Sequence, residues 1–310
     1  MNIAFLCRHY GKSFRGAETY VRELSSHLSR LGHNVKIYPH IFSGIDKSTQ
    51  ILISTNGRLD AILARFWCLF YHAKLIIPGQ SGPGIDDRWN LWCFPDTFVA
   101  LTDFQLYWAR KANPFVSVVK IPNGIDPAVF NSQVTPLKIN ISRPIILIVA
   151  AFTPAKRLDL AIRAVAKLKR GSLLLVGDGD QKDYLIQLGN QLLGRRFAAL
   201  KLPYSQVPQI YPAADLFTFP TVPYESFGIV LLEAMASGLP VVATADPIRA
   251  EIVGDSGLFV DPTDTETYAA TLKHALNTSW GKKPLIQAQK FTWGKIASDY
   301  DRLFRKLCSQ

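Results

Sequence analysis

The sequence has few cysteines, and none of them is spaced for a metal site. Among its 310 residues are four cysteines, Cys7, Cys68, Cys93 and Cys308. They are scattered and lack the short paired spacings of zinc ligands. We therefore expect free thiols in a reducing compartment.

Three other features are missing. The loop at residues 8–17 contains Gly11 and Gly16 but no Gly-x-Gly-x-x-Gly fingerprint, which argues against a dinucleotide cofactor. The most hydrophobic segment, Leu59 to Pro78, is interrupted by acidic and basic residues and is not expected to span a membrane. The apolar run at residues 1–7 is too short for a signal peptide, which favours a cytoplasmic location.

The composition is that of a basic globular protein. Hydrophobic residues make up 48% and charged residues 19%, with a net charge of +11. A basic balance suits anionic partners such as nucleotide diphosphates, lipid-linked phosphates, phospholipids or nucleic acid. No long Lys/Arg tract and no nucleic-acid motif is present, which favours small anions and a membrane surface over nucleic acid. A diffusely basic soluble surface remains the alternative.

Strand and helix patterns alternate along two parts of the chain. Short buried apolar runs such as 51–54 and 145–149 are followed by segments with three- and four-residue apolar spacing. Such repeats predict parallel sheets with helices on both faces, and hence two Rossmann-like β/α/β domains. The expected ranges are 1–135, 136–290, and a closing helix at 291–310 that crosses back to the first domain. The polar, turn-rich stretch from Asn131 to Arg143 is the expected linker.

Two glutamates interrupt an apolar stretch in the second domain. From Pro223 to Thr244 the pattern predicts a loop, a buried helix and a buried strand. Ser226 is the expected helix N-cap, with Glu225 just before the helix and Glu233 within it. Eight helical steps span about 12 Å, roughly the reach from the sugar to the ribose of a nucleotide diphosphate sugar. A diphosphate between them would be held by the N–H groups and dipole of the helix N-terminus.

These residues resemble the signature of the family 4 retaining glycosyltransferases of the GT-B fold. The match is Glu225-x7-Glu233, with Ser226-Phe227-Gly228 after the first glutamate and an Ala-Met-Ala-Ser-Gly-Leu-Pro-Val-Val segment after the second. The resemblance covers nearly the whole chain and implies two Rossmann-like domains facing across a cleft. A purely structural interpretation stays open, in which Glu225 is a solvated loop acid and Glu233 is a helix acid whose hydrogen bonds are satisfied within the fold.

The resemblance also implies the donor site. Glu225 and Lys156 are the implied catalytic residues. The implied donor-binding residues are Gly16, Arg157, Val207, Ser226, Phe227, Gly228, Ile229, Val230 and Glu233. The second of the two glutamates would bind the ribose hydroxyls.

The phosphate site departs from the family pattern at one position. Lys156 stands where the family has its phosphate-binding lysine, but the usual arginine five residues earlier is Ala151. Arg157 or Arg15 is expected to supply part of the missing charge. Because cations are unfavourable at a helix N-terminus, a bound anion explains Lys156 and Arg157 better than solvation does.

The acceptor side is implied more weakly. Its expected residues are His9, Arg15, Gln80 and Asn123. Gln80 stands where many family members carry a histidine, and Asn123-Gly124 is expected to form a tight turn near the crossing between domains. The aromatic segment Asp86–Trp92 is interpreted as a connection that lines an acceptor pocket, touches a membrane interface or caps a core.

The sequence therefore predicts a retaining glycosyltransferase. It would move a hexose-type sugar from a nucleotide diphosphate sugar to an acceptor hydroxyl, in glycolipid, lipopolysaccharide or polysaccharide synthesis. No Asp-x-Asp motif lies in the candidate site, so neither an obligatory metal nor another cofactor is expected. The expected location is cytoplasmic, with peripheral attachment to the membrane left open. The alternatives are a non-catalytic nucleotide-sugar-binding protein, a related phosphorylase or sugar-nucleotide epimerase, and a nucleic-acid binder.

Overall fold

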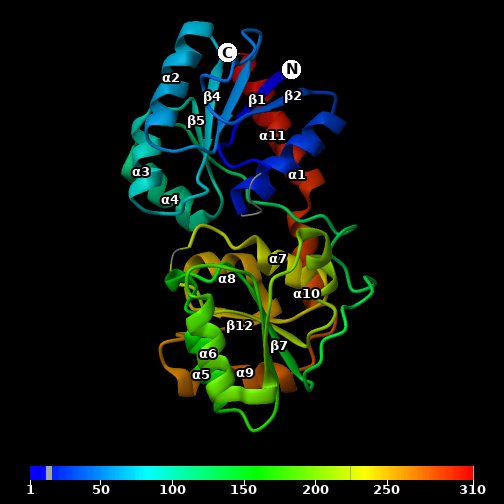
Figure 1. Ribbon diagram of the computed structural model, residues 1–310. Helices are drawn as coiled ribbons and strands as arrows, with labels where there is room; N and C mark the ends of the chain where they lie inside the picture. Colours follow the sequence, from blue (N-terminus) through cyan, green and yellow to red (C-terminus); the bar gives the residue numbers. More distant parts are fainter. Residues whose placement is uncertain (12–15, 224, 310) are drawn as a thin grey trace. The chain divides into compact units, whose positions relative to one another are not determined.

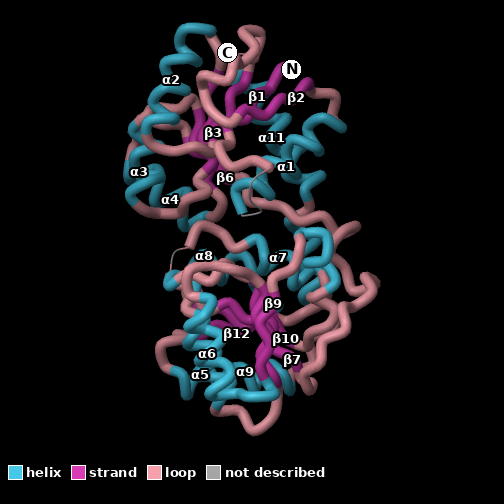
Figure 2. Tube along the Cα trace, viewed as in Figure 1, coloured by secondary structure: helices cyan, strands magenta, loops and turns pink. Residues whose placement is uncertain are grey.

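The chain folds into two compact units. The computed structural model describes residues 1–11, 16–223 and 225–309. Unit 1 comprises Met1–Gly124, Tyr224–Phe227 and Phe291–Gln310, and unit 2 comprises Ile125–Pro223 and Gly228–Lys290. Each unit is built on a six-stranded sheet with helices on its faces (Figures 1 and 2). The expected fold class, two Rossmann-like α/β domains, is confirmed.

The sheet of unit 1 has the order β2-β1-β3-β4-β5-β6, and all neighbouring strands are parallel. Its strands are β1 (Asn2–Leu6), β2 (Asn34–Tyr38), β3 (Ile51–Ser54), β4 (Lys74–Pro78), β5 (Thr97–Ala100) and β6 (Val118–Lys120). Its helices are α1 (Gly16–Arg30), α2 (Leu59–Tyr71), α3 (Ile85–Trp92), α4 (Asp103–Ala112) and α11 (Trp293–Cys308). Strands covered on both faces explain the unbroken apolar runs in the sequence.

Two separate cores form on the two faces of this sheet. One core joins strand residues such as Phe5 and Ile53 to α1 and α11. The hydroxyl of Tyr20 on α1 donates a hydrogen bond to that of Tyr300 on α11, at 2.8 Å. The other core joins strand residues such as Phe98 to α2, α3 and α4. The last helix of the chain is therefore part of the core of unit 1.

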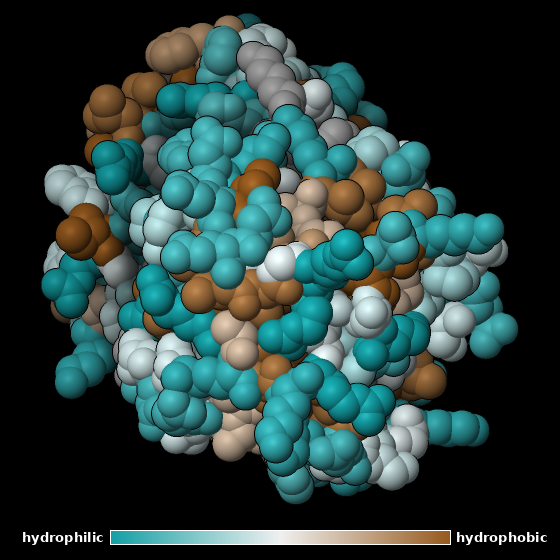
Figure 3. All heavy atoms as spheres, turned by 60° about the horizontal axis from the view of Figure 1, so that its bottom comes forward, coloured by the Kyte–Doolittle hydropathy of each residue, from teal (hydrophilic) through white to brown (hydrophobic). Residues whose placement is uncertain are grey.

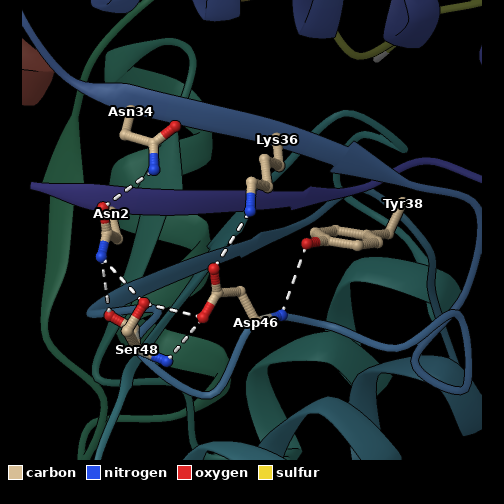
Figure 4. A network of polar contacts seen from close by, with 6 residues as sticks. All are labelled: Asn2, Asn34, Lys36, Tyr38, Asp46 and Ser48. Atoms are coloured by element: carbon tan, nitrogen blue, oxygen red, sulfur yellow. Dashed lines mark hydrogen bonds and ion pairs between the residues drawn. The ribbon is translucent and has the colours of Figure 1, made fainter.

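The loop between β2 and β3 is fixed by a polar network (Figure 4). The carboxylate of Asp46 accepts hydrogen bonds from the Ser48 backbone at 3.0 Å and the Ser48 hydroxyl at 2.7 Å. It also pairs with the Lys36 ammonium at 3.0 Å. These contacts, led by the backbone N–H of Ser48, lower the pKa of Asp46 to about 2.

The sheet of unit 2 has the order β12-β11-β10-β7-β8-β9, again parallel throughout. Its strands are β7 (Ile145–Val149), β8 (Ser172–Val176), β9 (Phe197–Leu200), β10 (Leu216–Phe219), β11 (Val241–Thr244) and β12 (Gly257–Val260). Its α-helices are α5 (Leu158–Ala166), α6 (Lys182–Leu193), α7 (Ile229–Ala236), α8 (Pro247–Val253), α9 (Thr265–Asn277) and α10 (Lys283–Ala288). The order of the strands reverses between β7 and β10, so ligands are expected at their carboxyl ends.

The structure corrects three local expectations. The segment Asp86–Trp92 is helix α3 and not an irregular connection. Gly124 does not form a tight turn. It is needed because a Cβ there would lie 2.6 Å from the Trp293 ring. The stretch from Asn131 to Arg143 is held by unit 2, since the Leu137 amide donates to the Gln209 carbonyl oxygen at 2.9 Å.

Candidate functional site

Two loops of unit 2 are tied together where the strand order reverses. The loop after β7 runs into a 3₁₀ turn, Pro154–Lys156, and the loop after β10 begins at Pro220. The Thr221 hydroxyl and the Val222 amide both donate to the Ala155 carbonyl oxygen, at 3.1 and 2.9 Å. The two loops therefore form one connected wall at the carboxyl end of the sheet.

A lysine and a helix start lie against the same aromatic ring of this wall. The ammonium of Lys156 is 5.4 Å from the ring centroid of Phe219, the last residue of β10. Gly228, which precedes α7 with φ 90°, approaches the same ring so closely that a Cβ would lie 3.0 Å from it. A cation and the amide end of a helix thus meet at one place, which is the arrangement that binds phosphate groups.

The neighbouring loop after β8 is packed tightly behind this wall. A Cβ on Gly177 would lie 1.8 Å from the Ala150 carbonyl oxygen, and one on Gly179 would lie 2.6 Å from that of Phe152. The Phe152 amide in turn donates to the Asp178 carbonyl oxygen at 2.8 Å. Glycine is therefore required at both positions for the loop that carries Lys156 to keep its path.

Glu233 on α7 is held by a tyrosine that the sequence did not single out. Glu233 is 5% exposed, and its Oε2 accepts a hydrogen bond of 2.5 Å from the Tyr211 hydroxyl. Burial, followed by the charge of Glu233, raises the pKa of Tyr211 well above its usual value, so the hydroxyl keeps its proton. The Tyr211 ring lies 5.8 Å from Phe130 and 5.9 Å from Phe217. The glutamate is thus oriented by a rigid partner.

The start of α7 differs from the expectation. The helix begins at Ile229, and its N-cap is Gly228, so Ser226 is not the cap. Only the last four of the eight steps from Glu225 to Glu233 are helical, so the 12 Å estimate does not describe this segment. The helix begins only at Ile229 because Gly228 has a left-handed backbone conformation, which interrupts the right-handed helical turns. Glycine adopts this conformation without strain.

The remaining predicted donor residues lie in two places. Ile229 is buried and Val230 half-buried in the first turn of α7. Val207 is half-buried in the 3₁₀ segment Tyr204–Gln209. Glu225 and Phe227 belong to the short stretch grouped with unit 1.

Within that stretch, Phe227 is buried, and its ring lies 6.3 Å from that of Phe291. Glu225 and Ser226 are half-buried. The roles predicted for these residues in donor binding stay predictions.

The charge of Arg157 acts on Asp261, an acid that follows the edge strand β12. It is half-buried in a left-handed conformation between the 3₁₀ turn and α5. The pKa of Asp261 is lowered by hydrogen bonds from Thr263 and, to a smaller extent, by the charge of Arg157. Ala151 is exposed and supplies no cation. Whether Arg157 replaces the missing arginine stays a prediction.

Two of the predicted acceptor-side residues meet in unit 1. Gln80 and the buried Asn123 exchange amide hydrogen bonds, from Gln80 Nε2 to Asn123 Oδ1 at 2.9 Å and from Asn123 Nδ2 to Gln80 Oε1 at 3.1 Å. His9 is exposed after β1, and Gly16 is exposed at the start of α1. Arg15 lies outside the described residues.

Comparison with protein-family models matches residues 131–290, slightly more than half of the chain, to the family described as glycosyl transferases group 1. The chain belongs to this family. The match covers the β7–β10 reversal, Lys156 and Glu233 of this group 1 transferase.

Two curated relatives are similar in sequence to this group 1 transferase. An uncharacterized glycosyltransferase of Methanocaldococcus jannaschii is 32% identical over 216 residues, which are 62% of this chain and 55% of the relative. The O-antigen chain mannosyltransferase B of Escherichia coli is 38% identical over 97 residues, or 30% of this chain and 25% of the relative. The chain thus spans about half the length of the first and a quarter of the second.

A solved structure shares the fold over the full length. The Anabaena protein HepE in complex with UDP-glucose matches with a TM-score of 0.81. The match covers 99% of this group 1 transferase and 100% of HepE, at 17% sequence identity. This likeness shows a common GT-B fold.

A buried acid supports the loop that carries Gln80 in the group 1 transferase. Asp87 on α3 accepts hydrogen bonds from Gln105 at 3.0 Å and Asn90 at 3.2 Å. Gln105 also donates to the Gly79 carbonyl oxygen at 2.8 Å, next to Gln80. Burial outweighs these hydrogen bonds and raises the pKa of Asp87 to about 7. The sequence missed this residue because α3 was not recognised as a helix.

The strand order of unit 1 also reverses, between β1 and β3. Arg8 follows β1, and its backbone amide donates to Asn56 Oδ1 at 2.8 Å. Its guanidinium pairs with Asp60 on α2 at 2.7 Å. The cation at this reversal in the group 1 transferase is therefore paired with an acid on the same unit.

Proposed function

We propose that this group 1 transferase moves a hexose-type sugar from a nucleotide diphosphate sugar to an acceptor hydroxyl, with retention of anomeric configuration and without an obligatory metal. The observation that carries the proposal is the meeting of Lys156 and the start of α7 at the Phe219 ring. This place suits a diphosphate, because a cation and helix amides both stabilise negative charge. The UDP-glucose complex of the structurally similar HepE supports the choice of ligand class.

The proposed chemistry follows from charge. The bond between the anomeric carbon and the phosphate oxygen breaks, and the electron pair stays on the phosphate. The Lys156 ammonium and the amides of Ile229 and Val230 stabilise the departing anion. The acceptor oxygen bonds to the anomeric carbon from the same face, and its proton passes to the departing phosphate.

Two glutamates complete the proposed site. Glu225 orients the sugar and stabilises positive charge near its ring. Glu233, oriented by Tyr211, accepts hydrogen bonds from the ribose hydroxyls. Val207 is proposed to touch the nucleobase.

The acceptor is proposed to be a glycan or a lipid-linked sugar in glycolipid, lipopolysaccharide or polysaccharide synthesis. The name of the E. coli O-antigen mannosyltransferase supports a polysaccharide role. We place the activity in the cytoplasm, with the acceptor side in unit 1, where Gln80 and Asn123 pair. A membrane-attached acceptor would also fit the net charge of +11.

A second candidate is a nucleotide-sugar-binding protein without transfer. Two observations favour it. Ala151 leaves the phosphate site with one cation fewer than the family pattern, and the Gln80 amide is engaged with Asn123. Such a protein would bind a donor and release no sugar to any acceptor.

The first test is thermal unfolding with a panel of UDP-, GDP- and ADP-sugars, in the presence and in the absence of EDTA. A ligand at one hundred times its dissociation constant stabilises the folded state by about 2.7 kcal/mol. We expect one nucleotide class to raise the melting temperature of the wild type and not of Glu233→Ala. Glu266→Ala is the matched control, since this exposed acid on α9 lies elsewhere in unit 2.

The outcomes separate the candidates. No shift with any nucleotide sugar would overturn both. A shift that EDTA abolishes would contradict metal independence. A clear shift with neither transfer nor hydrolysis of the donor, over a broad panel of acceptors, would favour the binding protein. Product analysis by NMR would then establish retention or inversion.

A further inference from the structure

Helix α2 carries its large apolar residues on the outside. The residues that face the sheet are small or polar, namely Asp60, Ala61, Ala64 and Cys68. Phe66 is 66% exposed and Phe70 is 75% exposed. They continue an outward stripe that begins at Leu59 and Leu63, at three- and four-residue spacing. This is the reverse of an ordinary surface helix, whose apolar stripe faces the core.

The next two helices continue the same surface. Trp89 and Trp92 on α3 are 55% and 51% exposed, and the residues of α3 that turn inward are Asp87, Asn90 and Leu91. The exposed large apolar residues of this surface are Leu59, Leu63, Phe66, Leu69, Phe70, Ile85, Trp89, Trp92, Phe94, Tyr107 and Phe115. We call this surface the α2–α4 face.

The α2–α4 face is one side of unit 1. Helices α2, α3 and α4 pack on the same face of the sheet and share one core. Arg58 at the start of α2 pairs with Asp86 on α3 at 2.9 Å, which joins the helices at their ends. In the space-filling view of Figure 3, hydrophobic residues gather at the upper left, the side on which Figure 1 draws α2 and α3. A contiguous apolar surface of this kind marks a contact with a partner or a membrane.

Cations outnumber acids on the α2–α4 face. Residues 57–120 contain no glutamate. The four aspartates other than the buried Asp87 are all ion-paired, as Asp60–Arg8, Asp86–Arg58, Asp96–Arg65 and Asp103–Lys120. Arg88 is exposed directly before Trp89 on α3, and Arg110 and Lys111 are exposed at the end of α4. The face thus combines aromatic residues with exposed cations.

We propose that the α2–α4 face docks on the surface of a phospholipid bilayer that contains anionic lipids. Tryptophan, tyrosine and phenylalanine are favoured at the boundary between headgroups and acyl chains. Arginine and lysine beside them are attracted to anionic headgroups. No helix within the described part of the chain is long and apolar enough to cross a membrane, so the contact is one of docking.

The sign of the charges decides against a second copy of the chain as the occupant. In a two-fold symmetric dimer the same face meets itself. Arg88, Arg110 and Lys111 would then face like charges, with their neighbouring acids already paired. An anionic bilayer supplies the opposite charge.

Docking deepens the proposed function by naming the surface that unit 1 meets, and its test needs no nucleotide sugar. The experiment is co-sedimentation of the full chain with vesicles of phosphatidylcholine alone, and of equal parts phosphatidylcholine and phosphatidylglycerol. We expect binding to the anionic vesicles and a blue shift of tryptophan emission, because Trp89 and Trp92 leave water. If the chain does not bind vesicles, the proposed binding of a nucleotide sugar is unaffected. The two proposals can therefore be contradicted independently.

Three paired variants locate the surface. Phe66→Ser with Phe70→Ser, and Trp89→Ser with Trp92→Ser, are each expected to weaken binding at least about tenfold, since each removes two inserted side chains. Arg88→Gln with Lys111→Gln should weaken binding to anionic vesicles about fivefold per cation and leave neutral vesicles unaffected. The matched control is Tyr184→Ser with Phe259→Ser, which changes exposed aromatic residues of unit 2.

The proposal is overturned if the wild type does not bind anionic vesicles, or if the α2–α4 variants bind as the wild type does. It is also overturned if the wild type self-associates in sedimentation equilibrium, loses this in the variants, and binds no vesicles. Then the occupant is a second copy. Because the altered aromatic side chains of α2 and α3 are more than half exposed, and Arg88 and Lys111 are exposed, the α2–α4 variants should fold, and unchanged circular dichroism melting would show it.

Discussion

The two units share one architecture and differ in what stands at the reversal of their strand order. In unit 1 the cation at this place, Arg8, is paired with Asp60 at 2.7 Å. In unit 2 the cation, Lys156, lies over the Phe219 ring, against which α7 also begins. A parallel sheet thus supplies a reversal of strand order in both units, and different side chains lie at the two reversals.

A second difference lies on the outer surfaces. The α2–α4 face of unit 1 gathers large exposed apolar residues on three consecutive helices. The large exposed apolar residues of unit 2, such as Tyr184, Phe259 and Ile286, are scattered over α6, β12 and α10. Single exposed apolar residues need no explanation, whereas a contiguous group does. The same sheet-and-helix plan can therefore present a binding surface outside its core.

The largest expected effect is on the rate of sugar transfer, and it distinguishes Lys156 from Arg8. Lys156→Ala should lower the rate of sugar transfer about 10²- to 10³-fold, as the loss of one group that stabilises a developing anion does. Arg8→Ala should leave the affinity for the donor unchanged. Steady-state kinetics and donor titrations measure both. If Lys156→Ala and Arg8→Ala lost donor affinity equally, the donor phosphate could not be assigned to the β7–β10 reversal of unit 2.

Lys182→Ala is the control for this comparison. Lys182 begins α6 in unit 2, and its ammonium lies 3.9 Å from the Asp178 carboxylate. We expect this variant to transfer sugar at nearly the wild-type rate. A large loss would indicate that the net positive charge of the unit matters and not the position of Lys156.

An intermediate effect compares two buried tyrosines. Tyr211→Phe removes a hydrogen bond to the Glu233 carboxylate, and we expect a loss of about 1.5–3 kcal/mol in the free energy of unfolding. Tyr300→Phe in unit 1 removes a neutral hydroxyl pair with Tyr20, for which about 1 kcal/mol is expected. Urea unfolding measures both. Tyr211→Phe should also weaken donor binding, and Tyr300→Phe should not.

A further effect is a pH dependence that arises in unit 1. The pKa of Asp87 is raised to about 7, so between about pH 4 and pH 7 the folded state binds more protons at this site than the unfolded state. Its contribution to the free energy of unfolding therefore falls as pH rises through this window, by at most about 1.4 kcal/mol per pH unit. Asp87→Asn should remove this slope, as melting curves over the same pH range would show. An unchanged slope in the variant would assign it to other groups.

Most of the fold could be predicted from the sequence because parallel strands buried on both faces are unbroken apolar runs. The predicted runs Ile51–Ser54 and Ile145–Val149 match β3 and β7 in both bounds. Helix α3 could not be predicted, because it buries Asp87 and Asn90 and exposes Trp89. An inverted pattern of this kind defeats any argument from apolar periodicity.

The candidate site was predictable only where its signal is local. Lys156 and Glu233 were identified through motif positions, and the structure shows what each one contacts. Tyr211 carries no local signal, since its partner lies 22 residues away. The N-cap at Gly228 was missed because Ser226 fits a general preference, which the positive φ of the glycine overrides here.

Helix α11 gives the chain an unusual order of completion during synthesis. The strands of unit 1 are made first, but the core on one of its sheet faces contains Trp293, Tyr300 and Phe304. Until those residues leave the ribosome, α1 and the strands beneath it have an open apolar face, while unit 2 already has all its strands. Unit 1 is thus the first to begin translation and the last to complete its core. While its sheet is only partly covered, the nascent chain would need protection from aggregation.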